Sequence, residues 1–157
     1  MNIELLRLAT GRLAIKDILL NSSYIKTNEN FCPQESKPYE IQFKHYPVDS
    51  NTFDLLDENK QINLIRFRYL AGFRVLPEGL TDEEKMSDAS DKVEAEVIAT
   101  FSAIYTLTEE IPSEAIKEFS EHNLGYNVWP YWREYASSTA TRLGLPQFSI
   151  PLYRLPT

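Results

Sequence analysis

The sequence predicts an α+β fold: a four-stranded antiparallel sheet with a short and a long helix packed on one of its faces. Apolar and polar residues alternate along much of the first two thirds of the chain, which is the pattern of strands with one dry face and one wet face. The last third changes to apolar residues at helical spacing. The length of 157 residues suits one domain, so we expect residues 1–157 to fold as a single unit.

The first expected strand covers about residues 11–24, and its alternation is poor. Both Leu13-Ala14-Ile15 and Ile18-Leu19-Leu20 are apolar on the two faces of a strand. A strand of this kind is normally buried on both faces. In a small antiparallel sheet this indicates a second layer or a partner subunit. We therefore expect a subunit interface that includes Leu13, Ile15, Ile18 and Leu20.

Three further strands alternate clearly, over about residues 39–46, 61–76 and 93–107. The last two are expected to form a hairpin, because acidic residues of one could face arginines of the other across an antiparallel pair. The acids are Glu94 and Glu96, and the arginines are Arg66, Arg68 and Arg74. The connection over residues 77–91 is rich in Pro, Gly, Ser and acidic residues, so we expect a mobile, charged loop.

Two helices are expected in the last third. The first begins near Ser113, a residue suited to an N-cap, and ends at Asn123-Leu124-Gly125. The second begins near Pro130, because proline suits the first turn of a helix. It ends before Gly144, which stands where a C-terminal cap belongs. Residues 145–157 cannot continue the helix past their prolines and should form an extended, apolar segment.

Composition excludes several classes of protein. The formal charge of −7 argues against a nucleic-acid partner, which would require a basic face. No apolar run reaches the roughly 18 residues of a membrane span, so no membrane partner is expected. The N-terminus lacks the basic and apolar parts of a signal peptide, which makes the cytoplasm the expected compartment. A single cysteine cannot form an intramolecular disulfide.

No motif indicates catalysis. The chain has no glycine-rich phosphate loop and no serine in a nucleophile elbow. Cys32 has no neighbouring cysteine, and His122 follows Glu121 at a helix end, where a cation favours the helix dipole. The run Asp82-Glu83-Glu84 lacks the ligand spacing of a calcium loop. We therefore expect no catalytic residue, no metal site and no cofactor, and a protein that is not an enzyme.

One segment carries a family resemblance. It reads Asn127-Val128-Trp129-Pro130-Tyr131-Trp132-Arg133-Glu134, continues through Ser138 and Arg142, and reaches Leu145-Pro146-Gln147-Phe148-Ser149-Ile150-Pro151. This resembles the C-terminal region of SecB-type protein-export chaperones, in which a Pro-Tyr-x-Arg-Glu helix start precedes Ser-x-x-x-Arg and a Phe/Leu-Pro-Gln-Leu-x-Leu stretch. Upstream, residues 15–18 and 39–41 look like the starts of the family's first two strands. The resemblance covers roughly residues 8–155.

The resemblance implies an ATP-independent holdase that assembles as a dimer of dimers and binds unfolded polypeptides in long hydrophobic grooves. The client would be either an antitoxin in a toxin-antitoxin-chaperone system or a secretory preprotein destined for the translocase motor SecA. A homodimer or homotetramer is expected. The alternative is a non-enzymatic adaptor or assembly protein that binds one fixed, folded partner.

The resemblance also implies roles for particular residues. Trp129, Trp132 and Tyr135, at the start of and within the second helix, would line the client-binding groove. The segment after the helix would contribute four further lining residues: Phe148, Ile150, Leu152 and Tyr153. Packing on the sheet or closing the core is the alternative for all seven. Ala136 and Ala140 would lie at a helix interface between subunits, and Asp17 and Glu78 match acids that meet SecA, unless they are plain surface acids.

The sequence also departs from the family. The chain stops at Thr157 without the further helix and acidic tail that the family usually adds, and the second acid of the first strand is replaced by Asn21. We therefore expect the SecA-binding features to be incomplete, while the fold and the client-binding surface are retained. This favours the antitoxin as client.

Overall fold

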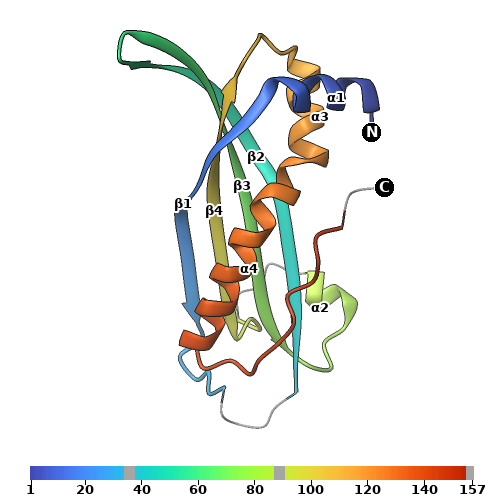
Figure 1. Cartoon of the computed structure of the whole chain (residues 1–157). Helices are drawn as coiled ribbons and strands as arrows, with labels where there is room; N and C mark the ends of the chain where they lie inside the picture. The colour runs from blue at the N-terminus through green and yellow to red at the C-terminus, as the bar shows by residue number, and fades with distance from the viewer. Residues whose placement is uncertain (34–37, 87–90, 155–157) are drawn as a thin grey trace.

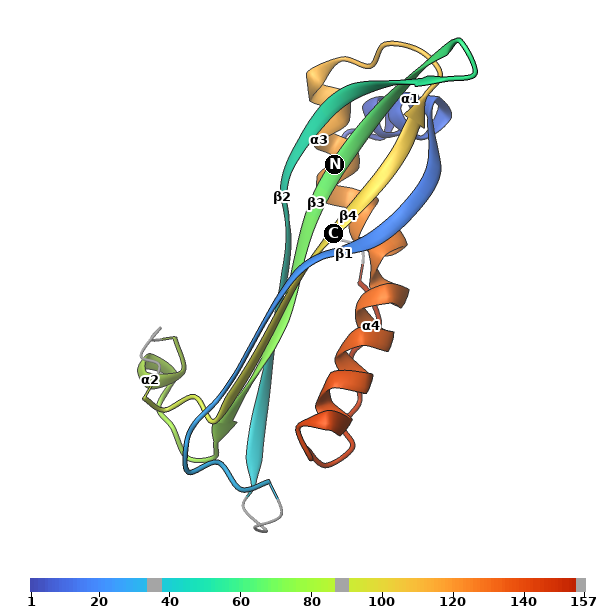
Figure 2. The same ribbon diagram turned by 90° about the vertical axis from the view of Figure 1, so that its left-hand side faces the viewer.

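The computed structural model describes residues 1–33, 38–86 and 91–154. Four antiparallel strands form one sheet in the order β1-β4-β3-β2. Their bounds are β1 Leu13–Thr27, β2 Tyr39–Asp57, β3 Lys60–Pro77 and β4 Ala95–Leu107. Helices α1 (Ile3–Arg12), α3 (Ser113–His122) and α4 (Leu124–Arg142) lie on one face of this sheet (Figures 1 and 2). The predicted α+β fold with helices on one face is confirmed.

The predicted hairpin of the two central strands is also confirmed. β3 and β4 pair antiparallel from Leu64 opposite Thr106 to Val75 opposite Ala95. Arg74 stands opposite Glu96, as the charge pattern predicts. The apolar face of both strands is buried under the helices and forms the core, with Phe67, Tyr69, Phe73, Val97 and Phe101 among its largest members.

Helix α1 is absent from the sequence-based prediction, which began the first strand at residue 11. The side chain of Asn2 caps this helix by accepting from the backbone N–H groups of Glu4 at 3.1 Å and Leu5 at 3.2 Å. Ala9 is fully buried, while the other residues of the helix are half-buried or exposed. The helix packs on α3, and a short helix that buries so little of itself leaves only a weak periodic signal.

Strand β2 extends eleven residues beyond the predicted end at Tyr46. Its register shifts between Pro47 and Asp49, and this bulge breaks the alternation that predicted the strand. Because β2 is the edge strand of the sheet, a proline there removes no ladder hydrogen bond. The turn to β3 consists of Glu58 and Asn59, whose φ angles of 45° and 66° suit a two-residue hairpin turn.

Helix α4 begins at Leu124, so the prediction that it starts near Pro130 is wrong. Pro130 lies inside the helix, where its missing N–H leaves the carbonyl of Tyr126 without its usual helical partner. Because Tyr126 is exposed, water can donate to its carbonyl instead. Burial of Leu124 and Val128 stabilises the helical turn before Pro130. The first helix also differs at its start, because the N-cap is Pro112 and Ser113 is the first helical residue.

The predicted cap at the end of α4 is confirmed. Gly144 has a φ of 69° and donates its N–H to the carbonyl of Thr141, while Leu145 donates to that of Ala140, both at 3.0 Å. This pair of bonds is a Schellman motif, which requires a residue in the left-handed region. The chain then leaves the helix and runs without regular structure through residues 145–154.

The connection over residues 77–91 contains a short helix, α2 (Asp82–Met86), at the end of the sheet where β3 ends (Figure 1). Thr81 and Glu84 cap it reciprocally, and Glu84 also pairs with Lys92, which together lower the pKa of Glu84 to about 2. Lys85 pairs with Glu40 of β2 at 2.8 Å. The rest of the predicted mobile loop, residues 87–90, lies outside the described residues. Among the described helices, none is long and apolar enough to cross a membrane.

Candidate functional site

Four rings gather where α4, the sheet and the C-terminal segment meet. His45 of β2 lies edge-on to Trp129 of α4 with a centroid distance of 4.9 Å, and it lies 5.6 Å from the ring of Tyr153. Trp129 and Tyr153 are 5.5 Å apart. The Nδ1 atom of His45 is 2.6 Å from the hydroxyl oxygen of Tyr69 on β3. These contacts place three elements and the C-terminal segment around one aromatic cluster.

This cluster is uncharged at neutral pH. Burial raises the pKa of Tyr69 far above its ordinary value, and its hydroxyl is hydrogen-bonded to that of Tyr153. His45 is an exposed residue, but the neighbouring rings partly cover its imidazole, and this partial desolvation lowers its pKa. The cluster is therefore a set of neutral rings in which Tyr69 and Trp129 are buried. Tyr153, half-buried, and His45, exposed, form its outer side.

The C-terminal segment, residues 145–154, runs back along α4 (Figure 1). The indole Nε1 of Trp129 donates to the carbonyl of Pro151 at 2.8 Å and fixes the segment to the helix. Phe148 packs against Phe73 and Phe43 of the sheet, with centroid distances of 5.3 and 6.2 Å. Leu152 points outward and is 73% exposed. The segment is thus anchored by its inward rings while it offers an apolar side chain to solvent.

Two surface depressions flank this segment. The larger has a volume of about 590 Å³ and lies between α4 and the end of the segment; its lining is Tyr126, Asn127, Trp129, Pro130, Arg133, Leu152 and Tyr153. The smaller, of about 280 Å³, lies at the end of α4 and is lined by residues that include Leu145, Phe148 and Ile150. The larger depression is an open hollow, shaped for surface contact rather than for enclosing a small ligand.

The seven residues predicted for a groove separate into three groups. Trp129, Leu152 and Tyr153 meet in the larger depression, and Phe148 and Ile150 meet in the smaller one. The other two line neither depression. Trp132 is fully buried, with its ring 6.2 Å from that of Phe73, and Tyr135 is half-buried against Phe101 at 6.3 Å. Trp129, at 4% exposure, and Ile150, at 8%, are also core residues and offer little surface to their depressions. The structure thus gives Trp132, Trp129 and Ile150 the core position that the sequence left open as the alternative.

Sequence reasoning missed Arg133, Tyr126, Asn127 and Pro130 as lining residues. Tyr126, Trp129 and Arg133 are spaced three and four residues apart, so they share one face of α4. That spacing is visible in the sequence, although the prediction followed apolar residues only. Asn127 also reaches inward, where its amide donates to the hydroxyl of Tyr105 at 2.9 Å.

The residues predicted for a subunit interface differ in their exposure to solvent, and only some of them are accessible to a second subunit. Ile15 is 53% exposed and Leu20 is 48% exposed, while Leu13 is half-buried. Ile18, Ala136 and Ala140 are buried in the chain's own core, so they offer little surface to a second subunit. Three apolar residues of β1 that the prediction missed are also about half exposed: Leu19, Tyr24 and Ile25. Ile25 stands opposite Val97, on the same face as Ile15 and Leu20, whereas Leu19 and Tyr24, opposite Ser102 and Ile98, lie on the other face.

The two acids predicted to dock SecA do not lie together. Asp17 is exposed on β1, opposite Ile104 of β4, which in turn pairs with Arg66 of β3. Glu78 is exposed just beyond the far end of β3. Some eleven strand residues, about 35 Å at 3.3 Å each, separate the two positions along the sheet. They do not form one acidic patch.

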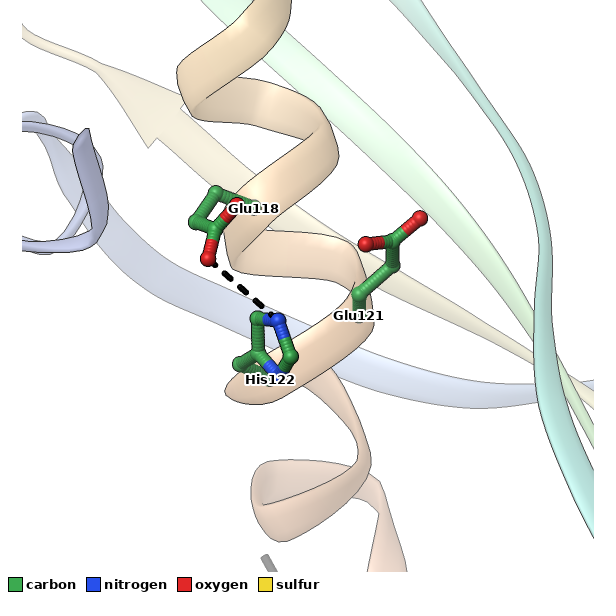
Figure 3. A group of neighbouring side chains, drawn as sticks. All are labelled: Glu118, Glu121 and His122. Carbon is green, nitrogen blue, oxygen red and sulfur yellow. Dashed lines mark ion pairs between the residues drawn. The ribbon is translucent and has the colours of Figure 1, made fainter. Parts of the chain in front are cut away.

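A third group, Glu118, Glu121 and His122, brings three possible ligand atoms within 4.8 Å of one another near the end of α3 (Figure 3). His122 Nε2 lies 3.3 Å from Glu118, which also accepts from the backbone N–H of Asn2 and lies 3.9 Å from the N-terminal ammonium. Glu118 therefore has partners from both helices. The group ties α1 to α3, and its contacts are those of a structural ion-pair cluster.

Comparisons with known proteins identify the fold. No protein-family model matches the chain, and no curated protein matches it by sequence. Among solved structures, it is similar to the Mycobacterium tuberculosis Rv1957 SecB-like chaperone in complex with a ChAD peptide from the Rv1956 HigA1 antitoxin. The TM-score is 0.69 at 16% identity, over 96% of this chain and 97% of that one. The SecB-like fold that the sequence predicts is confirmed.

Proposed function

We propose that this chain is a holdase chaperone that binds unfolded or unstable polypeptides without ATP and is not an enzyme. The observation that carries the proposal is the larger depression, which combines Trp129, Tyr153 and the 73% exposed Leu152 on a SecB-like fold. The exposed apolar surface comes from Leu152 and the half-buried ring of Tyr153, while Trp129, only 4% exposed, lies beneath them. This surface gains contacts when an apolar client side chain displaces water.

The form of the site suits an unfolded client. The two depressions lie at different places along the C-terminal segment, so one extended chain could contact both. Clients of a holdase differ in sequence, and several weak apolar contacts serve that task better than one closed pocket. Phe148 and Ile150, which are more deeply packed, would form the floor of the smaller depression.

The first client to test is an antitoxin. The solved structure with the same fold contains an antitoxin peptide, which is why we choose this client over a secretory preprotein. Delivery of preproteins to SecA would use Asp17 and Glu78, which lie far apart on the sheet. We propose that the chain works as a homodimer or homotetramer, supported by the half-exposed apolar side chains on both faces of edge strand β1.

The proposal is tested by mixing the purified protein with chemically unfolded model proteins and following their aggregation by light scattering. Suppression at a stoichiometric ratio, unchanged by ATP, is the expected result. A protein that binds no unfolded polypeptide, but captures one folded partner, would instead be an adaptor. Co-purification with an antitoxin encoded beside its gene, or with SecA, distinguishes the two clients.

A further inference from the structure

We propose that the larger depression selects client segments in which an apolar residue stands next to an acidic one, and that Arg133 is the residue that recognises the acid. This inference rests on the proposed holdase function and adds the chemistry of the preferred client. It concerns charge selectivity, which the apolar contacts alone would not provide.

The position of Arg133 suits this role. It stands one helical turn after Trp129 on α4, so the two side chains project from the same face. Both line the depression, whose remaining walls include Pro130 and Leu152. Among the described residues that line the depression, Arg133 is the only charged one. A cation therefore lines a hollow whose other described residues are uncharged and mostly apolar or aromatic.

The guanidinium of Arg133 is available. Among the described residues, nothing forms an ion pair or hydrogen bond with it, whereas Arg68 pairs with Asp49 and Arg12 with Glu109. Glu134, the next residue, projects about 100° further around the helix. The chain as a whole carries a charge of −7, so the sign at this depression is opposite to that of the protein. A cation at this place attracts an acidic segment to the depression.

The client chemistry follows from the reach of an extended chain. Consecutive Cα atoms are about 3.8 Å apart, so a residue beside the one inserted into the depression is held close to the rim. A carboxylate there can form a charge-assisted pair with the guanidinium, which presents a fork of donors. A lysine at the same place would be repelled. The preferred segment is therefore an apolar or aromatic residue flanked by Asp or Glu.

The experiment uses three fluorescent, unstructured peptides that differ only in the residue beside a central leucine, which is Asp, Asn or Lys. Their affinities are measured by anisotropy for the wild-type protein, Arg133→Gln and Arg133→Glu. Arg7→Gln is the matched control, because Arg7 is an exposed arginine on α1. The wild type should bind the Asp peptide about two- to fivefold more tightly than the Asn peptide, as for an exposed ion pair. High salt should reduce this ratio.

The variants separate the outcomes. Arg133→Gln should bind the Asp and Asn peptides equally, Arg133→Glu should prefer the Lys peptide, and Arg7→Gln should behave as the wild type. If Arg133→Gln keeps the wild-type preference for Asp, the assignment of Arg133 is overturned while the holdase function stands. If the wild type binds neither the three peptides nor any unfolded protein, the proposed holdase function is overturned, and the inference with it.

Discussion

The Nδ1 atom of His45 lies 2.6 Å from the hydroxyl oxygen of Tyr69, and the Tyr69 hydroxyl also forms a hydrogen bond with the hydroxyl of Tyr153. The three groups belong to the edge strand β2, the central strand β3 and the C-terminal segment. A neutral hydrogen-bonded series thus connects the edge of the sheet to the segment that borders the larger depression. Tyr69 is 2% exposed, so any loss of its partner would leave a polar atom buried.

The first prediction concerns pH. Burial lowers the pKa of His45 below its ordinary value of 6.5, so the unfolded chain binds this proton more readily than the folded one. The free energy of unfolding should therefore fall as the pH is lowered from 6.5 through the folded pKa. Urea unfolding at several pH values between 8 and 5 measures this slope. His45→Phe keeps a ring beside Trp129 but cannot titrate, so its slope should be smaller over the same interval; an equal slope would contradict the prediction.

The second prediction concerns Gly125 in α4. A Cβ atom there would lie 2.5 Å from the hydroxyl of Tyr69 and would also collide with that of Tyr153. Gly125→Ala should therefore destabilise the fold by about 1–3 kcal/mol through overpacking, although alanine is the better helix former. Thermal unfolding measures the effect.

The matched control is Gly11→Ala in α1, where a Cβ meets nothing within 4 Å. This variant should stabilise the protein by about 0.5–1 kcal/mol, because the helix gains a better former without a clash. Stabilisation by both substitutions would show that the two tyrosine hydroxyls can move aside at no cost.

The sequence predicts the central strands well because one face of each is dry. The alternation from Ile65 to Val75 arises because helices cover one face of the strand, so every second side chain is apolar and buried. Helix α1 and the first turns of α4 are not predicted, since they are stabilised by packing and capping and their periodicity is weak. Pro130 leads to a wrong predicted start for α4, because local preference places proline in the first turn of a helix. Here tertiary packing stabilises the helical turns before it, so the proline lies inside the helix.

The candidate site is predictable in its apolar part. Trp129, Leu152 and Tyr153 follow from the resemblance, and the structure brings them together. The sequence alone could not show that both tryptophans of the helix, Trp129 and Trp132, are buried and that only Trp129 also borders the depression. His45 continues the alternation of Ile41 and Phe43 on β2, so its place on the helix-covered face was visible in the pattern, although its exposure and its partner Tyr69 were not.

The third prediction concerns assembly. Ile15 and Leu20 are about half exposed on edge strand β1, where a second subunit would cover them. Light scattering should give the mass of a dimer or tetramer for the wild type. Leu20→Lys should lower that mass, because assembly would bury the added charge. Met86→Lys, at an 84% exposed position of α2, should leave it unchanged. A monomeric wild type would contradict the prediction.

The fourth prediction tests the larger depression directly. Leu152→Asp should weaken client binding about tenfold, because the client loses an apolar contact worth about 1.4 kcal/mol and meets a charge instead. The free energy of unfolding should change by no more than about 0.5 kcal/mol, since Leu152 is 73% exposed. Leu56→Asp is the matched control: this leucine is 84% exposed near the β2–β3 turn, outside both depressions. Equal loss of binding in the two variants would show that general surface charge, rather than the depression, controls affinity.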